Sequence, residues 1–134
     1  MKIALLEPLG VPAETIENLA RPLKDAGHEF VYFDTKTTDT TELARRSVGA
    51  EVVMIANNPY PAEAVHGADA LKMIAVAFTG IDHVALDACR ERGITTVCDV
   101  NYRGKMWSPE KSQATMKELL PLVDICIAND EDAP

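Results

Sequence analysis

Short apolar runs alternate along this chain with longer segments in which apolar residues recur every three or four positions. The runs have the length and the β-branched content of strands, and the segments between them have the period of amphipathic helices. Alternation of this kind builds a parallel sheet covered by helices. It predicts six strands, over residues 2–6, 29–33, 51–56, 72–77, 95–100 and 124–128.

The segments between the strands carry signals for where helices begin and end. Pro12 fits a first helical turn and Gly27 fits a left-handed C-terminal cap, with Ile16, Leu19, Ala20 and Leu23 as the buried stripe between them. Pro22 predicts a kink or an early end of that helix. Further helices are expected from Asp39 to Gly49, over 61–66, over 84–92, and from Ser108 onward, where Met116, Leu119, Leu120 and Val123 face a core.

Six parallel strands joined by right-handed crossovers favour one economical order. This order is 2-1-3-4-5 with strand six beside strand five, which is a doubly wound, flavodoxin-like α/β sheet in a single domain. Strand six is then an apolar edge strand, and such edges promote self-association. The chain is accordingly expected to be a monomer or a weak homodimer through that edge.

Composition excludes several classes of partner. The 134 residues carry a net charge of −8, which opposes binding to nucleic acid or to an anionic membrane surface. No apolar run reaches the length of a bilayer span. The three cysteines have no CxxC spacing, and neither they nor the histidines form a metal-ligand pattern. We expect reduced thiols, no metal, no cofactor and a cytoplasmic protein.

Polar residues gather where the predicted strands end, and ligands of open α/β sheets bind beyond that edge. One interpretation is a residual site for an anion or a keto acid, built from the Arg103 guanidinium and the Thr79 and Gly80 amides. The alternative is that these residues only cap helices and solvate loops. The residues concerned are Glu7, Asn57, Asn58, Thr79, Asp82, Asn101, Arg103 and Asn129.

Residues 71–94, LKMIAVAFTGIDHVALDACRERGI, have a strand, an F-T-G-I-D-H turn, a helix and an E-R-G-I re-entry. With this segment, residues 1 to about 96 resemble the substrate-binding domain of the D-2-hydroxyacid dehydrogenases. The resemblance implies that Phe78, Thr79 and Gly80 form the loop that meets a substrate carboxylate. It also implies that the catalytic arginine, acid and histidine belong to a nicotinamide-binding part, whose GxGxxG turn is absent from these 134 residues.

The residues from Asp99 onward have a different likeness. D-V-N-Y-R at 99–103, K-M-W-S at 105–108 and V-D-I-C-I-A-N at 123–129 resemble the ribokinase-like sugar kinases, in particular the 2-keto-3-deoxygluconate kinases. That resemblance implies that Asn101 and Arg103 approach sugar and phosphate groups. It likewise implies that Asn129 and Asp132 belong to a region that organises nucleotide and metal.

The two likenesses meet near Val97, which divides the chain into residues 1–97 and 98–134. Since neither family's full set of catalytic groups is recognised, the sequence indicates an engineered chimera that is not an enzyme and whose property is to fold. The alternative is a weak binding module for 2-keto or 2-hydroxy acids, or for small anions, at the carboxyl ends of the strands. No specific partner beyond such a ligand is expected.

Overall fold

The computed structural model describes residues 1–78, 80–102, 104–105 and 107–129. Six strands form one sheet: β1 Lys2–Leu5, β2 Glu29–Tyr32, β3 Val52–Ile55, β4 Met73–Val76, β5 Thr95–Asp99 and β6 Ile125–Ile127. Five α-helices and one 3₁₀ helix connect them: α1 Ala13–Asp25, α2 Thr40–Arg46, α3 Ala62–Gly67, α4 Leu86–Glu91, α5 Pro109–Leu119 and η1 Leu120–Leu122.

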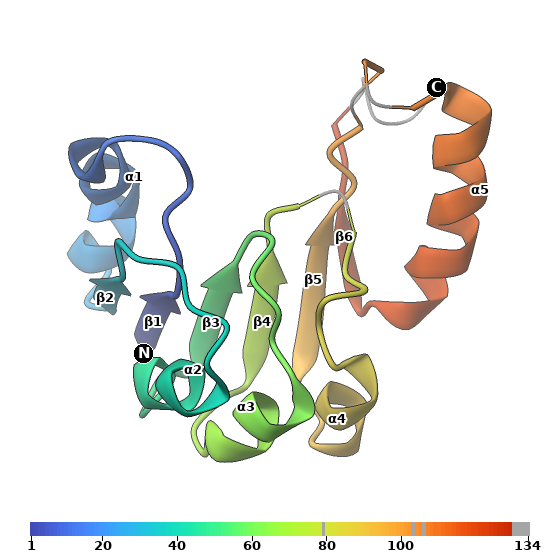
Figure 1. The fold of residues 1–134 in the computed structure, drawn as a ribbon. Coiled ribbons are helices and arrows are strands. Elements are labelled where there is room, and N and C mark those ends of the chain that lie inside the picture. Colours follow the sequence, from blue (N-terminus) through green and yellow to red (C-terminus); the bar gives the residue numbers. More distant parts are fainter. Residues whose placement is uncertain (79, 103, 106, 130–134) are drawn as a thin grey trace.

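The order of strands in the sheet is β2-β1-β3-β4-β5-β6, and every neighbouring pair is parallel. The predicted α/β fold and strand order are therefore confirmed, including the sixth strand beside the fifth. Strand order reverses between β1 and β3, so the loops after these two strands diverge there. In the picture, α2, α3 and α4 lie side by side along the sheet, α1 lies next to β2, and α5 lies beyond β6 (Figure 1).

The main core lies between the sheet and α2, α3 and α4. Alternate residues of the central strands, such as Val53 and Ile55 in β3, are fully buried and meet Leu43 of α2 and Val65 of α3. This two-residue alternation follows from strand geometry, because successive side chains point to opposite faces of the sheet. Tyr60 is buried in the same core, where its hydroxyl lies 2.8 Å from the Ser47 hydroxyl.

The helices depart from the predicted pattern at three positions. Leu19 is 72% exposed, although Ile16 and Ala20 of the same helix are buried as expected. Leu120 is exposed because the chain tightens into η1 after Leu119, which rotates it away from the core. Of the predicted kink or early end at Pro22, the early end does not occur, because the carbonyl that loses its N–H partner belongs to the exposed Asn18 and can bind water. The kink stays a prediction.

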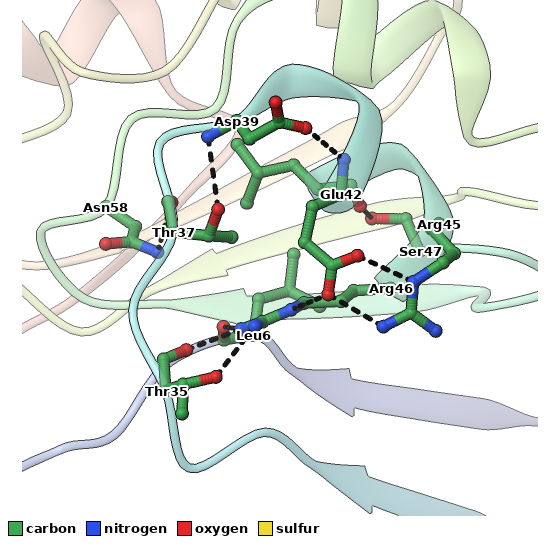
Figure 2. A network of polar contacts seen from close by, with 10 residues as sticks. Leu6, Thr35, Thr37, Asp39, Glu42, Arg45, Arg46, Ser47 and Asn58 are labelled. Carbon is green, nitrogen blue, oxygen red and sulfur yellow. Dashed lines mark hydrogen bonds and ion pairs between the residues drawn. The ribbon is translucent and has the colours of Figure 1, made fainter.

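An arginine in α2 joins the loop after β2 to the first strand. Arg46 is 6% exposed, and its guanidinium donates hydrogen bonds to the carbonyl oxygens of Leu6 (2.9 Å) and Thr35 (2.5 Å) and to the Thr35 hydroxyl (Figure 2). Its Nε also donates to Glu42. Bonds from Arg45 and Arg46 lower the pKa of the Glu42 carboxyl to about 2. This network fixes the loop that carries residues 35–37 beside the end of β1.

The second predicted segment is anchored to the first through β5 and β6. Asp124 Oδ2 accepts hydrogen bonds from the backbone N–H of Thr96 (2.8 Å) and from its hydroxyl (3.0 Å), and these bonds lower the pKa of the Asp124 carboxyl.

The β6 edge is apolar and exposed, with Ile127 56% accessible. No helix among the described residues could cross a membrane. Self-association through this edge remains a prediction.

Candidate functional site

A cleft of about 620 Å³ opens at the carboxyl ends of the central strands. Its walls come from the loops after β1, β3 and β4, from the end of β5, and from the loop between β2 and α2. The size is that of a pocket for a small molecule. The position is the one that the strand order predicts, because β1 and β3 are neighbours whose connections leave in different directions.

A lysine and a buried carboxylate form the charged wall of this cleft. The Lys36 ammonium donates a hydrogen bond to Asn57 Oδ1 (2.5 Å) and lies 3.5 Å from Glu7 Oε2. Glu7 itself is fully buried, and its Oε1 accepts hydrogen bonds from the backbone N–H groups of Ala56 (2.6 Å) and Asn58 (2.8 Å). Since Glu7 lies two residues after β1 and Lys36 four residues after β2, two neighbouring strand ends supply the pair.

The opposite wall is formed by Phe78 and Asn101, which follow β4 and β5. Asn101 has a φ of +46°, a left-handed conformation that asparagine tolerates better than most residues. Its backbone N–H donates to Asp99 Oδ1 (3.1 Å), so the aspartate stabilises this turn. The left-handed conformation turns the chain after β5 ends at Asp99, and Asn101 lines the cleft at this turn.

The structure brings only some of the predicted site residues together. Phe78 and Asn101 line the cleft, whereas Gly80 lines a separate groove of about 430 Å³ together with Asp82, Trp107 and Lys111. Asn129 follows β6 and is not part of either lining. Thr79, Arg103 and Asp132 lie outside the described residues. The predicted arrangement of Arg103 with the Thr79 and Gly80 amides therefore stays a prediction.

Lys36 was not among the residues that the sequence pattern singled out. The signal for it was available, because the polar run Asp34-Thr35-Lys36-Thr37 comes one residue after β2, the strand beside β1. However, β2 lies at the edge of the sheet, so its position alone does not place the following loop at a central cleft. What brings Lys36 over the end of β1 is the anchoring of its loop by Arg46, which periodicity does not reveal.

His83 and the buried thiols of Cys89 and Cys98 are not available as an acid, a base or a nucleophile. His83 Nε2 lies 2.7 Å from the carbonyl oxygen of Ala56, and the ring packs edge-on against Phe78. Burial raises the pKa of the Cys98 thiol to about 11 and also raises that of Cys89, so neither is a ready nucleophile. Across the described stretches of the chain, no cluster of residues suited to a metal ion is found. The cleft is therefore equipped to bind a ligand through Lys36 and amide groups.

Comparison with protein families identifies the larger part of the chain. The model of the D-isomer specific 2-hydroxyacid dehydrogenase catalytic domain matches residues 3–105. The match runs past Val97, so the join predicted there is not resolved by it. A glycerate dehydrogenase of Methylorubrum extorquens is 39% identical over 75 residues, which are 56% of this chain and 24% of that enzyme.

A curated protein of a different kind is also similar. A 2-dehydro-3-deoxygalactonokinase of Haloferax volcanii is 40% identical over 47 residues, which are 35% of this chain and 15% of the kinase. The two-part resemblance inferred from the sequence is thus supported by a dehydrogenase and by a sugar kinase. The chain spans a quarter or less of the length of these two relatives.

Solved structures share the fold. A 3-phosphoglycerate dehydrogenase of Entamoeba histolytica superposes with a TM-score of 0.65 at 22% identity, over 73% of this chain and 32% of that one. D-lactate dehydrogenase of Escherichia coli gives a TM-score of 0.60 at 23% identity, over 78% and 33% of the two chains. At these identities the likeness concerns the fold alone. The neighbours are roughly three times longer than the part that they share with this chain.

Proposed function

Because the chain belongs to the D-isomer specific 2-hydroxyacid dehydrogenase family, matching its catalytic domain over residues 3–105, we propose that it binds small 2-hydroxy and 2-keto acids in the strand-end cleft without turning them over. The observation that carries this proposal is the Lys36 ammonium, which is held at the wall of the cleft by Asn57 and Glu7. A carboxylate is the group that such an ammonium recognises.

The bound acid would meet a site that is partly prepared. An ammonium has three N–H donors. Lys36, whose side chain is 52% exposed, donates one to Asn57 and lies 3.5 Å from Glu7 Oε2, which leaves donors for a bound carboxylate. The Asn57 side-chain amide and the backbone around Gly10 supply further polar groups at the same wall. One exposed cation gives weak binding, since solvent screens it and ordering the side chain costs entropy. We therefore expect dissociation constants of about 1 mM.

Two features of the described residues support the proposal of binding without turnover. Hydride transfer requires a nicotinamide site, and the turn after β1, LEPLGVPAE, has a single glycine where a dinucleotide-binding turn has three. It also requires an acid–base group, whereas His83 is directed at a backbone carbonyl. These features support a role for this chain as a binding domain.

The origin that we propose is a designed chimera, in which a dehydrogenase fragment continues near Val97 into a sugar-kinase fragment. Two observations support it. One relative, matched over 75 residues, is a dehydrogenase, and the other, matched over 47 residues, is a kinase. In addition, β5 pairs with a strand from each predicted fragment, β4 and β6. A join inside β5, which has a neighbour on each side, preserves the ladder on both sides.

The experiment that tests binding is an NMR titration of the ¹⁵N-labelled chain with D-glycerate and with pyruvate. Amide signals of Gly10, Asn57, Phe78 and Asn101 should shift with each acid and stay fixed with glycerol, which has no carboxylate. If no signal at the strand ends moves at about 20 mM acid, well above the expected dissociation constant, the proposed function is wrong.

Replacing Lys36 by methionine should weaken the binding of D-glycerate about tenfold, because the charge-assisted hydrogen bond to the carboxylate is lost. The same titration measures it. The control is Lys24→Met, which removes an exposed lysine that pairs with Glu17 on α1, away from the cleft. Equal affinities in Lys36→Met and in the unchanged chain would show that Lys36 does not hold the acid.

A further inference from the structure

Glu7 is a buried acid whose position is fixed more firmly than binding alone requires. Its side chain is fully buried, and Oε1 is held by the N–H groups of Ala56 and Asn58 at 2.6 and 2.8 Å. Its other oxygen, Oε2, receives no hydrogen bond from the described part of the chain. That oxygen faces the Lys36 ammonium at 3.5 Å. The carboxylate therefore cannot turn away from Lys36 without releasing two backbone donors.

The consequence is a cleft whose fixed charges cancel. Among the described residues that line it, Lys36 is the single cation and Glu7 the single anion. A ligand with one negative charge can share the ammonium with Glu7. A ligand with a second charged group gains no further cation from these residues, and each of its charges is repelled by the buried carboxylate. Burial reduces the screening of that repulsion by salt.

We propose that the cleft selects monoanionic 2-hydroxy and 2-keto acids over acids with additional negative charge, such as phosphorylated ones, and that Glu7 determines this selectivity. The inference rests on the proposed function, because it assumes that a carboxylate binds beside Lys36. It adds a substrate class, which the fold alone does not specify, since both phosphorylated and unphosphorylated acids appear in the names of the similar dehydrogenases.

The effect of removing the charge of Glu7 should grow with the charge of the ligand. Electrostatic free energy is proportional to the product of the charges. Removing the charge of Glu7 should therefore increase the affinity for a multiply charged acid by a larger factor than the affinity for a monoanion. Glu7→Gln keeps an oxygen for the two backbone donors and removes the charge. We expect D-glycerate to bind about threefold more tightly to this variant, and 3-phospho-D-glycerate at least about tenfold more tightly.

The experiment measures the dissociation constants of D-glycerate and 3-phospho-D-glycerate for the unchanged chain and for Glu7→Gln at the same ionic strength. The unchanged chain should prefer D-glycerate by at least about tenfold, and Glu7→Gln should narrow that preference. The matched control is Asp34→Asn, which removes one exposed acidic charge from the loop that carries Lys36. It should leave the preference within about twofold, because solvent screens that charge.

Each outcome separates the two claims. If neither acid binds the unchanged chain, the proposed function fails and the inference fails with it. If D-glycerate binds but 3-phospho-D-glycerate binds as tightly or more tightly, the inference alone is overturned. If Asp34→Asn and Glu7→Gln reduced the preference for D-glycerate by the same factor, the inference would also be overturned, since net charge would then explain the effect. Should Glu7→Gln lose its cooperative melt, the unchanged chain decides the matter. Its preference for D-glycerate should persist on added salt, because the Glu7 carboxylate is buried, and loss of the preference on added salt would overturn the inference.

Discussion

Replacement of Arg46 by alanine should lower the free energy of unfolding by about 2–4 kcal/mol. The guanidinium donates to the carbonyl oxygens of Leu6 and Thr35, and Leu6 is fully buried. Alanine would leave these acceptors without their donor and remove the guanidinium that lies over the Phe33 ring, with its carbon 4.8 Å from the ring centroid. Denaturant unfolding at neutral pH, where Glu42 is ionised, measures the loss.

The neighbouring arginine is the matched control. Arg45 forms two hydrogen bonds with the same carboxylate, Glu42, but its side chain is 65% exposed. Exposed ion pairs of this kind stabilise a fold by less than about 1 kcal/mol. Arg45→Ala should therefore cost much less than Arg46→Ala. Equal losses in the two variants would mean that the backbone bonds of Arg46 do not stabilise the loop after β2 (Figure 2).

A chain that ends after Val97 should lose its cooperative melt altogether. The deletion removes Cys98, Val100 and Leu119, which are buried, and cuts β5 in the middle. It also takes away Asp124 and thereby the two hydrogen bonds that hold Thr96. We expect an insoluble or molten product, recognised by a broad thermal transition, binding of a hydrophobic dye and lost near-ultraviolet dichroism.

The control for this deletion is Ile127→Thr in the whole chain. Ile127 is exposed at the β6 edge, so its replacement should keep the sharp transition. A sharp two-state melt of the shortened chain would contradict the expectation. It would show that residues 1–97 fold alone and that the following segment only rests against them.

Sequence periodicity was sufficient for the architecture, because each strand and helix carries its own local pattern. The strands over 29–33 and 51–56 and the stop at Gly27 follow from apolar runs and turn residues, and the right-handed crossover rule then leaves few strand orders. Periodicity is weaker at helix surfaces. Leu19 has the spacing of a core residue, yet it lies 72% exposed on α1, because an apolar side chain is not excluded from a surface.

The cleft was predicted less completely than the fold. Its location follows from the strand order, and Glu7, Asn57 and Asn101 are recognisable as residues that follow strands. The part that Lys36 plays depends on long-range contacts, in which Arg46 of α2 fixes the loop after β2. The predicted role of Gly80 stays a prediction. Gly80 was predicted beside Phe78 at the strand ends, and in the structure it lines a second groove together with Trp107 and residues of α5, a contact between distant segments that periodicity does not reveal.

The cleft needs Glu7 from the first predicted segment and Asn101 from the second, so the central claim is that both segments fold as one body. Native-state hydrogen exchange tests it most directly. The amides of Thr96 and Val100, which bond to Asp124 and Ile127, should exchange with the same free energy of opening as the amides of Leu6 and Ala77 in the middle of the sheet. If Thr96 and Val100 open at a clearly lower free energy than Leu6 and Ala77, the two segments are separate units and the claim is contradicted.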